Sequence, residues 1–598
     1  MDAFSKSRKL TLLLLTILTP LTFLATGPTA LLAGDSPISM AGPDGQGLHL
    51  EKMDMKIALH GSLSLTEMEM VFRNPKNRQV EGKFNCTLPT GATISRFAKE
   101  VKGKLMEGEV VERKKATRVY TQILHTMRDP ALLEQDQGNV FKARVFPIPA
   151  RGTVRLLLSY SRVTPVTEKG ERRIEVPLKG LQKMKKFDLL AICRPMPGEV
   201  VQLADASGNT RPMKKKDRVV YAEERSEEDF EPKEDLVFIF RPTAAAQRTT
   251  FLRAGDFQMV SLRPQVPDVS RKSDSRPWLF FVDTSASLAS QGDLRLRALQ
   301  RTLDEIKTLA PKARFKIFAF DLDVQEMKAR PWHKALAKLS ERHFLGGTNL
   351  MKLCQEVSAQ AQAIKSGARI VLVTDGVATF GTKDVGEIKK SLSLTAKDNL
   401  HMLVIGAKED ERVTRSLADQ GRGRVVRLPL TSSWGENAAS AASSLLRPVG
   451  VTVTLYDEGA EWIEPAVFRD VLPGAELVAF SKLRGANSSQ VGMTWDEGMV
   501  KIGGRKVDRQ LKGQTLQDPD FAPLLEREAY RARLALLEKQ RDDSESAEER
   551  KNLIDEMINI SVGRRVLCPL TSLLVLETEA DYDRFEIDRR ALKDIMVV

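Results

Sequence analysis

Short apolar runs alternate with longer amphipathic segments in the middle of the chain. The runs are continuous, which is typical of strands buried on both faces of a sheet: WLFFVD, FKIFAFD, RIVLVTDG, HMLVIGA and GRVVRL. Between them, segments such as 293–310 and 349–366 have the apolar spacing of helices. Strands that alternate with helices predict a parallel sheet covered on both faces. We therefore expect a doubly wound α/β domain at residues 275–447.

The flanking regions instead alternate apolar and polar residues, as half-buried strands do. This pattern predicts a β-rich domain at residues 40–165, interrupted by one helical stretch, VVERKKATRVYTQILHTM. It continues at residues 166–274 and returns at 448–515, and we expect these two stretches to pack together as one split β-sandwich. The α/β domain would then be inserted into that sandwich. The charged runs MKKKDR and EERSEEDFEPKED are interpreted as solvated hairpin tips or loops.

The two ends of the chain differ in character. Residues 516–598 are predicted to hold a charged helix at 522–560, followed by a buried strand pair or a turn and strand at 562–578. Residues 1–34 combine a basic start, an apolar stretch and small residues, which is the pattern of a signal peptide. We expect an exported protein of the periplasm, the cell envelope or the medium. An uncleaved membrane anchor is the alternative, and only then would the protein contact a membrane.

The formal net charge of +13 changes this picture little. The chain lacks a basic stripe interleaved with aromatic residues, which form only 6% of it, so we expect no nucleic-acid partner. We interpret the charge as an aid to solubility and a weak attraction to acidic polymers. The four cysteines form no CxxC pair, so no zinc site is predicted: Cys86, Cys193, Cys354 and Cys568. Buried free thiols are favoured over disulfides, although every disulfide pairing stays open.

Hydroxyl and carboxylate side chains occur in three segments of the α/β domain. The segments are DTSAS at the end of a buried strand, GGTNL before a helix, and TDG after another strand, and they contribute Asp283, Ser285, Ser287, Thr348 and Asp375. Ligands bind beyond the carboxyl ends of parallel strands, so these segments can converge there. All five side chains offer oxygen, which suits Mg²⁺ best and also Mn²⁺ or Ca²⁺. Because only two are carboxylates, the bound ion would keep a positive character that attracts an acidic group.

In this order and in these strand contexts, the five residues resemble the metal-ion-dependent adhesion site of von Willebrand factor type A domains. The resemblance implies that Ser285, Ser287 and Thr348 are metal ligands. Asp283 and Asp375 would ligate the metal directly or through water, and an Asp or Glu of a partner protein would complete the coordination. It thus implies a protein ligand and no small-molecule substrate.

The N-terminal β-rich region is similar to the VIT domain, which accompanies such A domains in inter-α-trypsin inhibitor heavy chains and in many bacterial exported proteins. The similarity lies in VFRNP, FNCTLPTGATISRF, KKATRVYTQ, NVFKARVFPIPARGTVRLLLSY and, near the C-terminus, VLCPLTSLLVLETEADY. The heavy chains also bear a DPHF motif, whose histidine is replaced in the segment from Asp518 to Phe521 by Asp520. We interpret that segment as a turn that begins the charged helix.

Each motif also has a simpler interpretation. The Asp and Ser of DTSAS commonly cap helices, and Thr348 or TDG alone would be a cap or a turn, so only their combination favours a metal site. Asp321 and Asp323 hint at a phosphatase nucleophile, but Gln325 departs from that motif. No GxSxG, Walker A or HExxH sequence occurs. We therefore predict a metal-dependent adhesion or scaffolding protein rather than an enzyme. The alternatives are a metal-assisted hydrolase and a structural envelope protein with a vestigial metal site.

Overall fold

The computed structural model describes residues 36–589 apart from short gaps. The gaps comprise residues 125–130, 137, 167–169, 206–207, 218, 245, 247, 267–274, 330, 343, 432–433, 486–488, 497–508, 511–512 and 518–520. The predicted signal peptide at 1–34 and the residues from Asp518 to Asp520 lie outside the described residues. Within the described part, no helix is both long enough and apolar enough to cross a membrane. All four cysteines are buried and free, which confirms that prediction.

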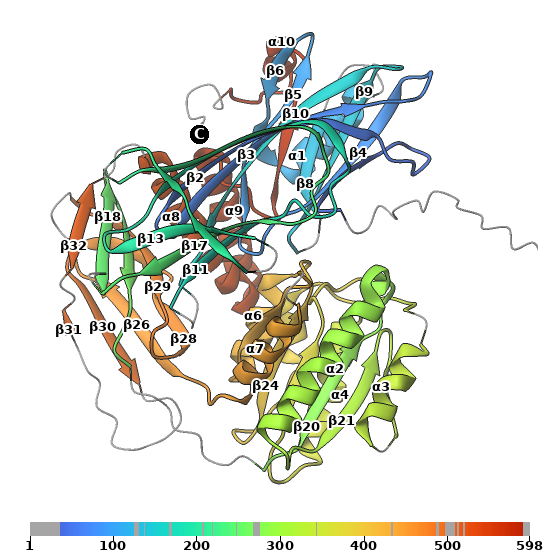
Figure 1. Ribbon diagram of the computed structural model, residues 1–598, viewed down its shortest axis with the longest axis vertical. Coiled ribbons are helices and arrows are strands. Elements are labelled where there is room, and N and C mark those ends of the chain that lie inside the picture. Colours follow the sequence, from blue (N-terminus) through green and yellow to red (C-terminus); the bar gives the residue numbers. More distant parts are fainter. Residues whose placement is uncertain are drawn as a thin grey trace, which may run out of the picture.

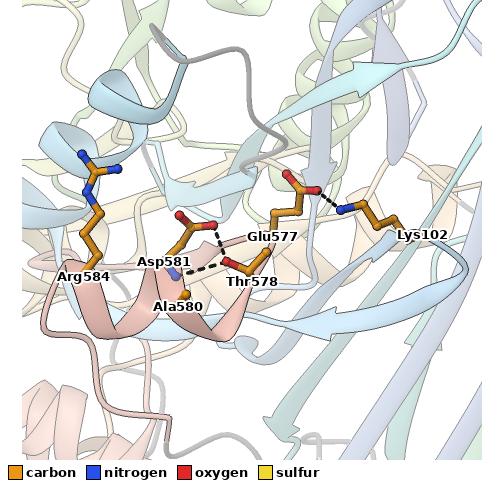
Figure 2. Close-up of a pocket in the computed structure, with 6 residues that line it drawn as sticks. All are labelled: Lys102, Glu577, Thr578, Ala580, Asp581 and Arg584. Carbon is orange, nitrogen blue, oxygen red and sulfur yellow. Dashed lines mark hydrogen bonds and ion pairs between the residues drawn. The ribbon is translucent and has the colours of Figure 1, made fainter.

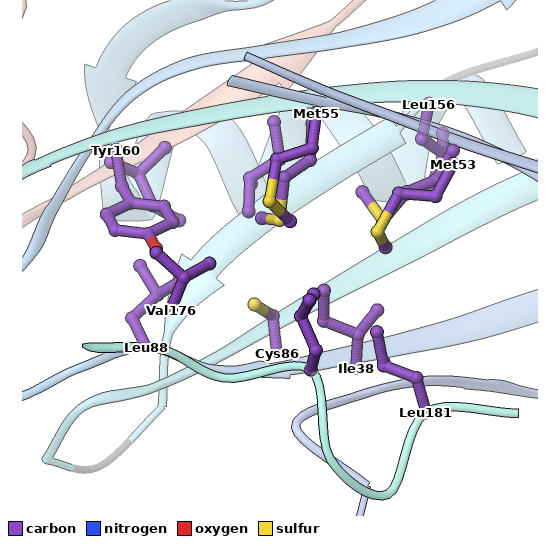
Figure 3. Close-up of a cluster of buried hydrophobic side chains, with 14 of the residues drawn as sticks. Ile38, Met53, Met55, Cys86, Leu88, Leu156, Tyr160, Val176 and Leu181 are labelled. Carbon is purple, nitrogen blue, oxygen red and sulfur yellow. The ribbon is translucent and has the colours of Figure 1, made fainter. Parts of the chain in front are cut away.

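Two sheets face each other in the N-terminal region. Sheet A has the order β1 (Ile38–Ala41), β4 (Val80–Thr87), β9 (Val140–Ile148), β8 (Ala131–Gln135), β33 (Thr571–Val575) and β7 (Glu109–Glu112). Sheet B contains β2 (His49–His60), β3 (Leu63–Arg73), β10 (Thr153–Val163), β5 (Thr93–Val101) and β6 (Lys104–Glu107). Alternate residues of β2 are buried, and Met53 and Met55 lie opposite Ile38 and Cys86 of sheet A (Figure 3). The alternation read from the sequence thus builds the core between the two sheets.

Strand β33, near the C-terminus, lies inside sheet A. It pairs antiparallel with β7 on one side and with β8 on the other, and all its residues are buried. The helix α1 (Arg113–Leu124) contributes Tyr120 and Ile123 to the buried cluster beside Leu574 of β33. The segment at 562–578 was predicted to form either a strand pair or a turn and strand. It supplies a single strand to the N-terminal sheet.

Sheet B extends beyond the predicted domain boundary. Strand β12 (Met184–Arg194) pairs parallel with β2 and antiparallel with β16 (Tyr221–Phe230), which carries β15 (Lys214–Lys215) at its edge. The boundary predicted between residues 165 and 166 therefore falls within a set of strands that share one sheet. The charged run EERSEEDF, predicted to be a loop or hairpin tip, is a strand. It tolerates its charges because alternate side chains face solvent, where Glu228 bonds Lys186 of β12 at 2.8 Å.

The strands at 172–242 differ from the predicted half-sandwich. Sheet C has the order β11 (Arg172–Val176), β17 (Leu236–Pro242), β13 (Glu199–Ala204) and β14 (Thr210–Pro212). Its apolar side chains, including Val176 and Phe238, belong to the same core as sheets A and B. These strands thus pack with the N-terminal sheets and not in a common sheet with residues 448–515, because their apolar faces complete the core that β2 and β4 begin.

Two further sheets contain the strands that flank the α/β domain in the sequence. Sheet D has the order β27 (Ala460–Glu464), β29 (Leu477–Leu483), β19 (Phe257–Leu262), β18 (Thr249–Ala254) and β32 (Gln514–Gln517). Sheet F has the order β28 (Val467–Val471), β26 (Val451–Asp457), β30 (Val491–Asp496) and β31 (Arg509–Gln510). Leu262 and Leu477 of sheet D share a buried cluster with Val453 of sheet F. Strands from before and after the α/β domain therefore lie side by side in sheet D.

A buried ion network joins sheet C to the segment before β29. The guanidinium of Arg172, which is 1% exposed, lies 2.9 Å from Glu199 and 3.0 Å from Glu476. Burial alone would raise the pKa of the Glu476 carboxyl, but the charge of Arg172 holds this pKa below its ordinary value. The network thus connects a part of the chain that precedes the α/β domain in the sequence with a part that follows it.

The α/β domain lies to one side of these sheets (Figure 1). Sheet E has the order β22 (Val324–Glu326), β21 (Phe315–Phe320), β20 (Trp278–Asp283), β23 (Arg369–Val373), β24 (Asn399–Ile405) and β25 (Val425–Leu428), and only β22 is antiparallel. One face packs against α2 (Gly292–Leu309), α3 (Trp332–Ser340) and α7 (Trp434–Leu446). The other packs against α4 (Leu350–Gln362), α5 (Val385–Lys390) and α6 (Glu411–Gln420). The five strands and the two-sided cover predicted for this region are confirmed.

The charged segment at 522–560 forms two helices instead of one. α8 (Ala522–Asp543) ends before Ser544, and α9 (Ala547–Arg564) begins after Ser546, whose side chain accepts a hydrogen bond from the Glu549 N–H at 3.2 Å. The S-x-x-E spacing of Ser546 and Glu549 is a helix-start signature that explains the break. α8 packs on sheet D, and its C-terminal end contacts the α/β domain, where Arg412 lies 3.4 Å from Glu538.

Candidate metal centre

The strand order of sheet E places a crevice between β20 and β23. The chain leaves β20 toward β21 on one side, and β23 then adds to the other side, so their carboxyl ends form a topological switch point. Asp283 is the last residue of β20, and Asp375 lies two residues beyond the end of β23. Ser285 directly precedes the 3-10 helix η1 (Ala286–Gln291), and Ser287 is its second residue. The fold thus brings both carboxylates of the predicted site to the edge where α/β proteins bind ligands.

Hydrogen bonds connect the first and third segments of the predicted site. One oxygen of Asp283 accepts a bond from the Ser285 N–H at 2.9 Å, and the other accepts one from the Thr374 hydroxyl at 2.7 Å. The hydroxyl oxygens of Ser285 and Ser287 lie 3.1 Å apart. Sequence reasoning missed Thr374, although it directly precedes Asp375 at the end of the strand. Its role is to fix the Asp283 carboxylate.

The loop that carries Thr348 joins the same cluster. The Ala286 N–H donates to the Gly346 carbonyl at 3.1 Å, which ties this loop to the DTSAS turn. The Thr348 N–H donates to the Thr379 hydroxyl at 2.7 Å, and the Thr348 carbonyl accepts from the N–H groups of Thr379 and Phe380 at 3.2 Å. These bonds hold the backbone of Thr348 on both sides and leave its hydroxyl for another partner.

Glycine is required after Asp375 for two reasons. Gly376 has a φ of +75°, a conformation that side-chain-bearing residues rarely adopt. A Cβ at this position would also lie 2.9 Å from the Cγ2 of Thr414. The TDG segment can therefore turn sharply after β23, so that Asp375 stays at the sheet edge.

Two predicted ligands have buried polar atoms without a hydrogen-bond partner in the described part of the chain. They are the Oγ1 of Thr348 and the Oδ2 of Asp375, and both residues are 0% exposed. Burying an oxygen without a partner costs free energy, so such atoms are rare in folded proteins. Both would gain a partner from a cation bound between the loops. The donor set therefore fits a hard divalent ion.

The two carboxylates of the crevice interact with each other and with two side-chain cations, Lys408 and the buried Arg295. Burial, and then the negative charge of Asp375, raise the pKa of the Asp283 carboxyl to about 6. The ammonium of Lys408 lies 3.6 Å from the Oδ2 of Asp375. Sequence reasoning missed Lys408, although it follows β24, whose carboxyl end lies at the same sheet edge. Positive charge at this place offsets the repulsion between the two carboxylates.

The site opens to solvent at one of its predicted ligands. Asp283, Ser285, Thr348 and Asp375 are at most 2% exposed, whereas Ser287 is exposed. Access for a partner group is therefore expected on the side of Ser287.

The raised pKa of Asp283 predicts how Mg²⁺ affinity depends on pH. A proton would compete with a bound Mg²⁺ for this carboxylate, so the affinity for Mg²⁺ should fall roughly tenfold per pH unit once the pH drops below about 6. The stability of the metal-free protein should instead decrease as pH rises. The raised pKa stabilises the fold at pH values below the ordinary pKa of an aspartate, and this stabilisation is lost as pH rises through about 6. Calorimetric titration with Mg²⁺ and thermal unfolding in EDTA, each over this pH range, measure the two trends. Equal affinity on both sides of pH 6 would contradict the prediction.

The loop between β24 and α6 connects this site to the N-terminal sheets. Its Asp410 N–H donates to the Asp375 carbonyl at 2.7 Å. On its other side, the Glu409 N–H donates to the Asn139 side chain at 3.0 Å, and the Asn139 amide donates to the Ala407 carbonyl at 2.8 Å. The contact is close, because a Cβ on Gly138 would lie 2.4 Å from the Glu409 carbonyl oxygen. The β-rich part of the chain thus contacts the loop that carries Lys408, whose side chain stays 31% exposed.

Other surfaces fit a metal or ligand less well. An open depression of about 430 Å³ lies beside α10 (Glu579–Arg584) (Figure 2). Its two carboxylates already have partners, since Glu577 lies 2.7 Å from Lys102 and Asp581 accepts a hydrogen bond from the Thr578 hydroxyl at 2.7 Å. Among the described residues, no group of three or more His, Cys, Asp or Glu side chains is placed to hold a metal ion. A site in this part of the chain would therefore depend on hydroxyl oxygens, as the α/β crevice does.

Comparison with known proteins identifies the N-terminal region. Residues 50–160 match the Vault protein inter-alpha-trypsin (VIT) domain, and no curated protein matches the chain. The solved ArnB paralog VWA2 from Sulfolobus acidocaldarius is 15% identical, with 57% of this chain and 92% of that one covered and a TM-score of 0.26. A von Willebrand factor type A protein from Catenulispora acidiphila is 12% identical, with 60% and 99% covered and a TM-score of 0.30. Residues 50–160 of this chain are therefore a VIT domain.

Proposed function

We propose that this protein binds a partner protein through a divalent cation held in the crevice of its α/β domain. Mg²⁺ is the expected ion, and Asp283, Ser285, Ser287, Thr348 and Asp375 would hold it. When bound, the ion supplies a positive centre that accepts a carboxylate of the partner.

The observation that carries this proposal is the pair of buried oxygens without hydrogen-bond partners, on Thr348 and Asp375. The two atoms come from different loops, and both loops are tied to the DTSAS turn that carries Asp283 and Ser285. A purely structural turn would satisfy its buried oxygens with N–H groups, as it does for the carbonyl oxygen of Thr348. These two oxygens are therefore available to coordinate a cation.

Binding is proposed rather than catalysis because of the groups that surround the crevice. The hydroxyls of Ser285 and Ser287 face each other at 3.1 Å, and Thr374 donates to Asp283, so these contacts provide no histidine base for a nucleophile. We further propose that the protein acts at the cell envelope or outside the cell, because its N-terminal 34 residues have the pattern of a signal peptide.

Thr348→Val tests the proposal, since it removes one candidate ligand oxygen and keeps the shape of the side chain. Thr308→Val, on the exposed surface of α2, is the matched control. We expect wild type and control to bind Mg²⁺ in a calorimetric titration and to retain an envelope protein only when Mg²⁺ is present. Thr348→Val should lose both properties. Mg²⁺ binding without a retained partner would favour a vestigial site, and turnover of ester or phosphate substrates would favour a hydrolase; either result contradicts the proposal.

A further inference from the structure

Three large apolar side chains are exposed on the loops that surround Thr348. Leu322 is 42% exposed, Leu345 is 65% exposed and Phe380 is 55% exposed. They come from the loop after β21, the loop before α4 and the loop after β23, so the fold gathers them from three separate segments. Single exposed apolar residues are ordinary, but a group of them beside a candidate binding site indicates an interaction surface. We call these three residues the apolar rim.

The contacts of two glycines show how close the rim is to the site. A Cβ on Gly347 would lie 3.0 Å from the Cβ of Phe380 and 3.7 Å from a methyl carbon of Leu322. A Cβ on Gly346 would lie 3.6 Å from the Cγ of Leu322. Gly347 directly precedes Thr348, whose carbonyl accepts the Phe380 N–H. The rim therefore borders the loop that carries one candidate metal ligand.

The charged groups next to the rim have partners within the domain. Asp321 lies 2.9 Å from Arg342, and Asp323 lies 4.0 Å from Lys352. The ammonium of Lys408 lies at Asp375, on another loop. A visiting carboxylate would thus be drawn toward the cation and Lys408, whereas the rim offers chiefly apolar surface.

The VIT domain contacts the site elsewhere, at the loop that carries Lys408. There, Asn139 of the VIT domain bonds Glu409 and Ala407, which lie on either side of Lys408. The rim is not covered in this way, as its exposed fractions show. The rim is therefore an open surface beside the site, on which a partner that reaches the metal can pack.

From this placement we propose that the partner presents its carboxylate beside a large apolar side chain, which packs on Leu322, Leu345 and Phe380. The inference rests on the proposed function, because the metal defines where the carboxylate sits. The rim would then decide which acidic segments are selected, since it adds affinity only for those with an apolar neighbour.

Immobilised peptides that each contain one glutamate test this inference. The residues beside the glutamate are leucine, phenylalanine, serine or lysine, and retention of the full protein is measured with Mg²⁺ and with EDTA. In Mg²⁺, we expect leucine and phenylalanine neighbours to raise retention about tenfold over serine. The double variant Leu345→Ser with Phe380→Ser should lose this preference and keep its Mg²⁺-induced thermal shift. Leu309→Ser, which changes a 46% exposed leucine at the end of α2, is the matched control and should keep the preference.

The possible failures are distinguishable. Mg²⁺-dependent retention of every glutamate peptide, whatever its neighbours, would overturn the apolar rim and leave the proposed function standing. A preference that survives in the double variant would overturn the rim as its cause. If no glutamate peptide is retained in Mg²⁺, the proposed function and this inference fail together.

Discussion

Asp375→Asn is expected to abolish stabilisation by Mg²⁺ without destabilising the metal-free protein. The substitution removes a buried carboxylate that the proposed cation needs, so Mg²⁺ affinity should fall on the order of 100-fold or more. It also removes the negative charge that helps to raise the pKa of Asp283, so the protein in EDTA should unfold at the same temperature as wild type or higher. At a Mg²⁺ concentration of about 100 times the Kd, wild type should gain about 2.7 kcal/mol that the variant does not.

Thermal unfolding with Mg²⁺ and with EDTA measures both effects in one experiment. Asp323→Asn is the matched control, since Asp323 is an aspartate near the same sheet edge whose side chain is 86% exposed and which is not a candidate ligand. The control should respond to Mg²⁺ as wild type does. A large loss of stability for Asp375→Asn in EDTA would instead show that the carboxylate has a structural role, and the metal site would lose its main support.

Arg172→Ala is expected to cause a large loss of stability far from the candidate metal site. It would leave Glu199 and Glu476 buried and without the guanidinium that lies within 3.0 Å of both. Removing one partner from a buried ion network typically costs about 3–5 kcal/mol. Because Glu476 would then be a buried carboxylate without that cation, the loss should grow as pH rises through its ordinary titration range.

The neighbouring arginine provides the matched control for this prediction. Arg173 is 34% exposed and pairs with Glu175 at 2.6 Å, so Arg173→Ala should change the free energy of unfolding by no more than about 1 kcal/mol. Urea unfolding followed by circular dichroism compares the two variants. Replacing these three charges together, with Arg172→Met, Glu199→Gln and Glu476→Gln, should recover most of the loss if unpaired charge is its cause. A midpoint for Arg172→Ala equal to that of Arg173→Ala would refute the prediction.

The α/β domain could be predicted well from the sequence because its signals are local. Each strand of sheet E that was predicted is a continuous apolar run, and Asp283 and Asp375 lie at the ends of two of these runs. The convergence of their loops then follows from the parallel arrangement. What the sequence could not show is which oxygens lack partners, because the partners of Thr348 and Asp375 depend on loop geometry. Lys408 was missed for the same reason.

The β-rich part was harder to predict because its pairings join distant residues. Nothing near β12 indicates that it pairs with β2, which lies more than a hundred positions earlier, or that Arg172 meets Glu476. The segment YAEERSEEDF shows no alternation of apolar and polar residues in the sequence, because charged residues occupy both faces of this strand near the edge of the sheet. The break between α8 and α9, by contrast, had a readable signal in the spacing of Ser546 and Glu549.

Strand β33 has a consequence for the order in which the chain is made. Among the described residues, Glu109–Glu112 reach the rest of sheet A only through Thr571–Val575, so this N-terminal sheet waits for a segment that is synthesised much later. Until then the side of β8 that later receives β33 lacks this neighbour and resembles an open sheet edge. The amino-terminal sheet therefore closes only after synthesis has passed Val575, and a chain cut short before Thr571 would keep that edge unprotected.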